Sequence, residues 1–133
     1  MAETYAVEMR GITKTFGSVV ANHDIDLDLR RGEILALLGE NGSGKTTLMN
    51  MLSGIYAPDA GSILVEGRPV AIKSPEDAKR LGLGMVHQHF KLVDVFSAAD
   101  NIWMGREKAG FLLKKDRYEQ VADMAKRFGF DLD

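Results

Sequence analysis

Residues 39–47 read GENGSGKTT, and this stretch constrains the fold more than any other part of the chain. It matches a glycine, four residues and then Gly-Lys-Ser/Thr, a pattern typical of a phosphate-binding loop between a strand and a helix. The apolar residues before it predict a short buried strand over residues 33–38. The residues after it contain no helix breaker up to Gly54, so they predict a helix over residues 46–53.

The residue types of this phosphate loop (residues 39–47) suit a bound anion. Gly39, Gly42 and Gly44 allow backbone angles at which successive amides converge on one phosphate. Lys45 adds a charge that reaches the β- and γ-phosphates, and the Thr46 hydroxyl is placed to ligate Mg²⁺. The first helical turn contains no acid, which fits an external anion at that end. The sequence therefore predicts a nucleotide site, with ATP as the expected ligand. The alternative is a glycine-rich turn with a solvent-exposed lysine.

Composition limits the class of protein. A chain of 133 residues is long enough for one domain with a core and too short for two. A net charge of −2 gives no basic field for nucleic acid or anionic lipid. The absence of cysteine excludes disulfides and thiolate metal sites. No apolar run is long enough to span a membrane and no signal peptide is visible, so we expect a cytoplasmic location.

Hydrophobic periodicity predicts further elements. Residues 24–30 alternate strictly, with Ile25, Leu27 and Leu29 on one side, which indicates a half-buried antiparallel strand. Strands are also predicted over residues 5–12, 62–65 and 83–87. Helices are predicted over residues 75–81, over 97–104 with Ser97 as the N-cap, and over 116–128. This order is typical of a mixed α/β protein.

Several motifs together resemble the ATP-binding cassette of ABC transporters. They are the phosphate loop with Gly-Glu-Ile at 32–34 and Leu-Ser-Gly at 52–54, and residues 11–17, 61–63 and 84–88. Residues 85–93 and 100–105 look most like importers for simple sugars and nucleosides. The resemblance implies an α/β ABC-type P-loop NTPase core, truncated: an N-terminal antiparallel β subdomain, a strand–P-loop–helix unit and the start of a helical subdomain. Residues 1–133 would be the N-terminal part of one ATP-binding domain. Residues 1–93 would form its β-rich core, and 94–133 the Q-loop exit and the first helices.

The resemblance also implies roles for individual residues. Phe16 would stack on adenine, although a core aromatic at a strand end is the alternative. Gln88 would be the Q-loop glutamine, which contacts Mg²⁺ and the attacking water; Thr46 and Gln88 would thus be the metal ligands. The nucleotide-binding residues expected in this way are Phe16, Gly39, Asn41, Gly42, Ser43, Gly44, Lys45, Thr46, Thr47 and Gln88.

The chain also departs from the family pattern. It contains no Leu-Ser-Gly-Gly-Gln signature, no apolar strand ending in Asp with a following catalytic Glu, and no later switch histidine. Because water must be polarised as well as phosphate held, we expect that this chain alone binds ATP but hydrolyses it negligibly. A full-length parent would be an ATPase coupled to transport. Its expected partners are transmembrane permease subunits, contacted through residues 88–101, and a second cassette on the inner face of the membrane, with no nucleic acid.

Other readings of the phosphate loop stay open. A GTPase or small-molecule kinase is disfavoured because an antiparallel-type strand comes first and no Asn-Lys-x-Asp sequence is present. An ABC-type ATPase acting on DNA would carry a long coiled coil, and no heptad stretch is visible. A non-catalytic nucleotide-binding module is the remaining alternative.

Overall fold

The computed structural model describes residues 5–87, 89, 92–104 and 114–131. The chain divides into two compact units, Met1–Val86 and His87–Asp133. The sequence analysis predicts the boundary between the β-rich core and the helical part after Val93, seven residues further on.

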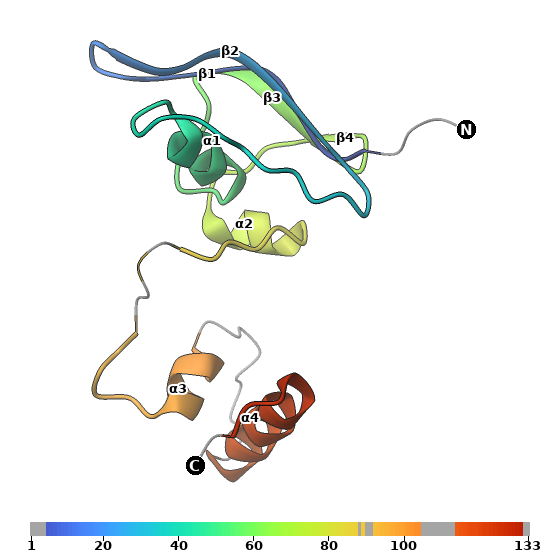
Figure 1. Cartoon of the computed structure of the whole chain (residues 1–133), viewed down its shortest axis with the longest axis vertical. Coiled ribbons are helices and arrows are strands. Elements are labelled where there is room, and N and C mark those ends of the chain that lie inside the picture. Colours follow the sequence, from blue (N-terminus) through green and yellow to red (C-terminus); the bar gives the residue numbers. More distant parts are fainter. Residues whose placement is uncertain (1–4, 88, 90–91, 105–113, 132–133) are drawn as a thin grey trace. The chain divides into compact units, whose positions relative to one another are not determined.

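An antiparallel sheet forms the frame of the first unit. In the described residues it has four strands in the order β2-β1-β3-β4. A long hairpin of β1 (Tyr5–Phe16) and β2 (Val19–Arg30) lies beside β3 (Ala60–Val65), which continues into the short β4 (Arg68–Val70) (Figure 1). The strands predicted over residues 5–12, 24–30 and 62–65 are confirmed, and β1 and β2 extend further than predicted. β4 was not predicted.

One helix covers the sheet and completes the core of this unit. Helix α1 (Lys45–Leu52) buries Leu48 and Met51 among apolar side chains of β1 and β3, such as Met9 and Ile63. The side chains of Ile25, Leu27 and Leu29 pack partly buried against this core, which confirms the alternation predicted for β2. The core therefore fixes the position of α1, and with it the end of the phosphate loop.

Helix α2 (Pro75–Arg80) follows β4 and confirms the predicted helix over residues 75–81. The Asp77 amide donates a hydrogen bond to the Ser74 hydroxyl at 3.2 Å, and Pro75 stands at the start of the helix. Both features are favoured at helix N-termini, because they satisfy or remove an amide that the helix itself cannot pair.

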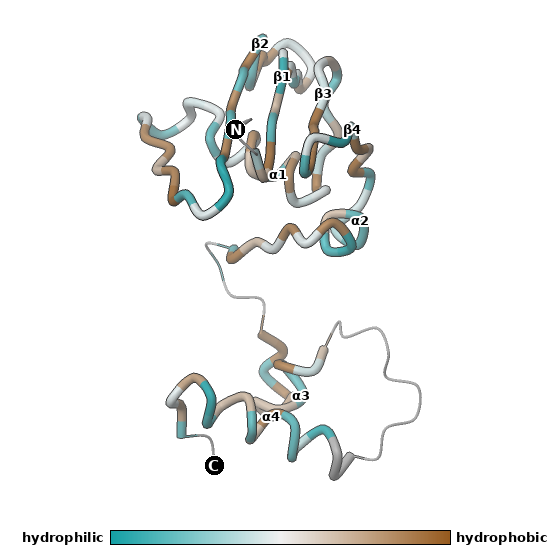
Figure 2. The backbone as a smooth tube through the Cα atoms, turned by 90° about the vertical axis from the view of Figure 1, so that its right-hand side faces the viewer, coloured by the Kyte–Doolittle hydropathy of each residue, from teal (hydrophilic) through white to brown (hydrophobic). Residues whose placement is uncertain are grey.

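Two predicted strands are wrong. Residues 33–38 and 83–87 have no regular secondary structure, and neither segment pairs with a strand in the part of the chain that is described. Ile34 is 98% exposed, Leu38 89% and Val86 88%. Figure 2 shows the first segment as a hydrophobic stretch between β2 and α1, set apart from the strands. An apolar run indicates that a segment can be buried, but a strand also needs a hydrogen-bonding partner, which local sequence does not supply.

The second unit contains two helices in its described part, α3 (Ala98–Trp103) and α4 (Lys114–Phe128). Both predicted helices are confirmed, and the Ser97 hydroxyl accepts a hydrogen bond from the Asp100 amide at 3.1 Å, as expected of an N-cap. Val121 and Ala125 are the buried apolar positions of α4. Among the helices that the structure describes, none combines the length and apolar character that crossing a membrane requires.

Candidate phosphate-binding site

The phosphate loop leads directly into α1, and Gly44 stands at their junction as the N-cap. Its φ of 87° lies in the left-handed region, which glycine adopts without strain. A Cβ atom at this position would stand 2.3 Å from the carbonyl oxygen of Ala21 in β2. Glycine is therefore required here twice, once for the backbone angle and once for the close approach of the hairpin. The N-terminus of α1 carries no side-chain capping hydrogen bond in the described structure.

The Lys45 ammonium lies folded back over the loop. Nζ donates hydrogen bonds to the carbonyl oxygens of Gly39 and Glu40, at 2.6 Å each, and to the Ser43 hydroxyl at 3.1 Å. The loop is further closed by a hydrogen bond from the Ser43 amide to the Glu40 carbonyl oxygen, at 3.2 Å. The positive charge is thus held by polar groups of the loop itself.

Asn22 ties β2 to the same junction. The residue is 6% exposed, and its Nδ2 donates to the carbonyl oxygen of Gly44 at 3.3 Å. The Leu48 amide donates to the same oxygen at 2.9 Å, as the first hydrogen bond of α1. Asn22 Oδ1 accepts no hydrogen bond from any described residue. The sequence analysis did not identify this residue, because nothing local marks an asparagine in a strand as a contact of a loop 22 positions away.

The remaining loop residues lie around this junction. Asn41, Gly42 and Ser43 are exposed, and Gly42 has a φ of 84°. Thr46 is exposed in the first turn of α1, and Thr47 is half-buried. The structure therefore brings together all the loop residues that the sequence singled out. Gln88, the other expected Mg²⁺ ligand, lies outside the described residues.

Phe16 ends β1 and belongs to an aromatic contact that the sequence did not predict. Its ring lies 5.1 Å from that of Tyr56, centroid to centroid, at an interplanar angle of 71°. The Lys14 ammonium lies 5.5 Å from the centroid of the Phe16 ring. Phe16 is 41% exposed, so it is not a core residue. Across the hairpin it pairs with Val19, close to the part of β2 that touches Gly44.

Asp59 holds Lys14 in place. One carboxylate oxygen accepts from Lys14 Nζ at 3.0 Å, and the other accepts from the Thr15 amide at 2.7 Å and the Thr15 hydroxyl at 3.0 Å. The Thr15 amide, the Lys14 ammonium and the Thr15 hydroxyl lower the pKa of Asp59 from 3.8 to about 2. The carboxylate is therefore ionised throughout the neutral range.

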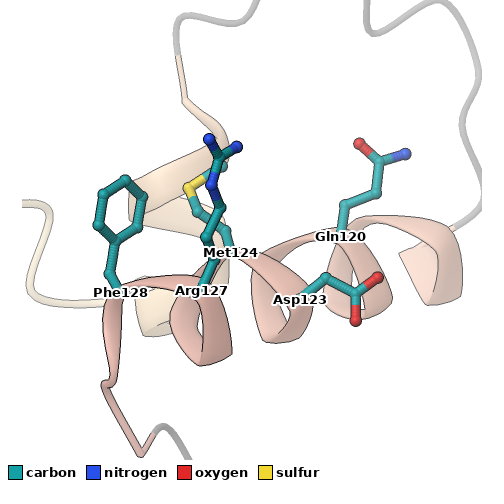
Figure 3. Close-up of a pocket in the computed structure, with 5 residues that line it drawn as sticks. All are labelled: Gln120, Asp123, Met124, Arg127 and Phe128. Atoms are coloured by element: carbon teal, nitrogen blue, oxygen red, sulfur yellow. The ribbon is translucent and has the colours of Figure 1, made fainter.

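A surface hollow lies on α4 in the second unit (Figure 3). It is lined by Gln120, Asp123, Met124, Arg127 and Phe128. These side chains come from successive turns of a single helix, so the hollow has no converging backbone amides and no glycine-rich segment. It does not offer the chemistry of the phosphate loop.

The glycine-lined loop, its lysine and the helix that follows define a P-loop nucleotide-binding protein. The sequence profile described as "ABC transporter" matches residues 22–132. The chain belongs to the ABC transporter family.

Curated relatives narrow the comparison further. The chain is 50% identical over 130 residues to the guanosine import ATP-binding protein NupO of Bacillus subtilis, covering 96% of this chain and 26% of that protein. It is 45% identical over 135 residues to the nucleoside import ATP-binding protein NupA of Lactococcus lactis, covering 100% of this chain and 27% of NupA. It is 46% identical over 129 residues to the ribose import ATP-binding protein RbsA 1 of Rubrobacter xylanophilus, covering 96% of this chain and 26% of RbsA 1. The chain thus spans about a quarter of the length of these relatives.

A solved structure confirms the fold. The chain superposes on cbiO1 of Clostridium perfringens, part of the ABC transporter complex cbiONQ, with a TM-score of 0.68 and 26% identity. The match covers 97% of this chain and 52% of cbiO1.

Proposed function

We propose that this chain forms the nucleotide-binding part of the ATPase subunit of an importer for simple sugars or nucleosides. One observation carries the proposal: the Lys45 ammonium is held by carbonyl groups of a loop whose Gly44 leaves no space for a side chain. The relatives named for guanosine, nucleoside and ribose import support the class of solute.

Lys45 and the loop amides would hold the triphosphate. The carbonyl oxygens of Gly39 and Glu40 now accept from the ammonium, and a β- or γ-phosphate oxygen would be a stronger acceptor because it carries charge. The positive end of α1 adds to this attraction. Asn41, Gly42, Ser43 and Thr47 would supply amide and hydroxyl contacts around the phosphates.

Mg²⁺ would neutralise part of the phosphate charge when bound. Thr46 fits this role, because it is an exposed hydroxyl-bearing residue in the first turn of α1, next to the glycine junction. Gln88 would be the second protein ligand.

Phe16 would provide the stacking surface for adenine. Its ring is partly exposed at the end of β1, and that end of the hairpin adjoins the phosphate loop through Ala21 and Gly44. A flat apolar ring buries apolar surface when it packs against a base, and this contact needs no hydrogen bond.

The whole protein would work as a motor component on the inner face of the cell membrane. Residues 1–93 would form the nucleotide-binding core, and residues 94–133 the start of a helical subdomain. Residues 88–101 would contact transmembrane permease subunits, and a second cassette would complete the ATP sites. Because these 133 residues include no signature sequence and no catalytic Glu after an apolar strand, they would bind ATP without hydrolysing it at an appreciable rate.

Equilibrium binding of Mg·ATP tests the proposal, with Lys45→Ala as the variant and GTP as a competitor. We expect saturable binding that weakens at least about tenfold in Lys45→Ala, or about 1.4 kcal/mol. Lys126→Ala, which removes an exposed lysine of α4, is the matched control and should bind as the wild type does. Equal affinity in the wild type and Lys45→Ala would contradict the proposal.

A further inference from the structure

Phe16 is contacted by one aromatic side chain that comes from outside its own strand. Tyr56 lies beyond the C-terminal end of α1, where its amide donates to the Asn50 carbonyl oxygen at 3.3 Å. Its ring meets that of Phe16 edge to face, a favoured geometry for aromatic pairs. Because the planes cross at 71°, Tyr56 does not stack parallel on Phe16 and does not replace a base there.

A second contact orients the same ring from its own strand. Lys14 Nζ, 5.5 Å from the ring centroid, stands within the range of a cation–π interaction. A free lysine would sample many rotamers, but this one is fixed at 3.0 Å from Asp59 Oδ1. Asp59 is in turn fixed by Thr15 through its second oxygen and by its own amide, which donates to the Thr13 carbonyl oxygen at 2.9 Å. The Phe16 ring is therefore contacted by Tyr56 and, separately, by Lys14, which Asp59 holds in place; we call Tyr56, Lys14 and Asp59 the brace.

We propose that Tyr56 and the Lys14–Asp59 ion pair are positioning residues that hold the Phe16 ring for stacking on the nucleobase. The inference rests on the proposed function, since it assumes that Phe16 receives a base. It goes beyond that function by assigning part of the base affinity to three side chains that do not themselves touch the nucleotide. Because the ring is already ordered before the nucleotide binds, less conformational entropy is lost when the base stacks on it.

The test compares two ligands that share phosphates and differ in the base. Affinities for Mg·ATP and for magnesium tripolyphosphate are measured on the purified protein and on Tyr56→Ala. We expect Tyr56→Ala to weaken ATP binding about fivefold and to leave tripolyphosphate binding within about twofold. Tyr56→Phe keeps the ring and should restore ATP binding to the wild-type value. Ile55→Ala truncates the neighbouring exposed side chain and should change neither affinity.

Lys14→Met is a second variant that keeps the aliphatic stem and removes the charge. It should also weaken ATP binding selectively, so the proposal stays testable if Tyr56→Ala does not fold. Unchanged ATP affinity in both variants, or an equal loss of both ligands, would overturn the brace, because the residues would then be inert or merely structural. A wild type that binds ATP no better than tripolyphosphate would overturn it as well, while leaving the phosphate site intact. Binding of neither ligand by the wild type would overturn the proposed function, and the brace with it.

Discussion

The Asn22 side chain donates a hydrogen bond to the carbonyl oxygen of Gly44, at 3.3 Å, and so joins the second strand to the junction between the phosphate loop and α1. The carbonyl oxygen does not depend on this bond, because the Leu48 amide also donates to it at 2.9 Å. The Asn22 Oδ1 atom, by contrast, is buried without a partner among the described residues. A buried polar atom in this state costs about 1–3 kcal/mol.

This arrangement predicts opposite effects for two substitutions. Asn22→Leu removes the unsatisfied oxygen and fills the site with apolar atoms, so the free energy of unfolding should rise by about 1 kcal/mol. Asn22→Ala removes the same oxygen but leaves a cavity, and should lower it by about 1 kcal/mol or more. Urea denaturation measures both values. A lower stability for Asn22→Leu than for Asn22→Ala would contradict this account of the site.

Gly44 and Gly42 offer a matched pair for testing how the phosphate loop is packed. Both have φ near 85°, so alanine at either position costs about 1–2 kcal/mol of backbone strain. At Gly42 nothing in the described structure lies within 4 Å of an added Cβ, whereas at Gly44 the Ala21 carbonyl oxygen lies 2.3 Å away. We expect Gly44→Ala to lose about 3 kcal/mol or more in urea denaturation, and Gly42→Ala only the strain. An equal loss of stability in the two variants would mean that the Ala21 carbonyl oxygen does not limit the space at Gly44.

The Asp59 carboxylate predicts a defined pH dependence. Its pKa falls from 3.8 to about 2 in the folded protein, first through the Thr15 amide and then through Lys14. A carboxyl with a lowered pKa stabilises the fold fully above its unfolded pKa, and this stabilisation disappears as the pH falls through the folded pKa. Wild type should therefore be more stable than Asp59→Asn at pH 6, and the pH-dependent part of the difference should shrink below pH 4 and vanish only below pH 2. Urea denaturation across this range measures it, and a difference that is independent of pH would contradict the assignment.

The sequence predicted those parts of the fold that depend on local patterns. Alternating side chains in β2 and the Ser97 cap of α3 are properties of a few consecutive residues, and both predictions are confirmed. The strand expected over residues 33–38 is wrong because pairing depends on a distant partner. The contacts of Asn22 with Gly44 and of Tyr56 with Phe16 were missed for the same reason. Asn22 and Gly44 are 22 positions apart in the sequence. Phe16 precedes α1 in the sequence and Tyr56 follows it.

Asn101 of α3 holds the turn that precedes the helix. Its Oδ1 accepts from the Val93 amide at 2.8 Å, and its Nδ2 donates to the carbonyl oxygens of Val93, Phe96 and Ser97 at 3.1, 3.3 and 3.1 Å. The turn lies within residues 88–101, the region that we propose as the contact with the permease. A side chain that bridges several backbone groups in this way fixes the surface that a partner would meet.

Hydrogen exchange at the Val93 amide tests this role directly, because that amide has its acceptor on Asn101. In Asn101→Ala the amide loses the acceptor, and we expect exchange to accelerate at least about tenfold, which corresponds to about 1.4 kcal/mol. Asn101→Asp keeps an acceptor oxygen but loses the donor to the carbonyls, so its effect should be intermediate. Ile102→Ala, which truncates an exposed side chain of the same helix, is the control and should leave the rate unchanged. If Val93 exchanged at the wild-type rate in Asn101→Ala, the turn would be held by its backbone, and a partner would recognise it without help from this side chain.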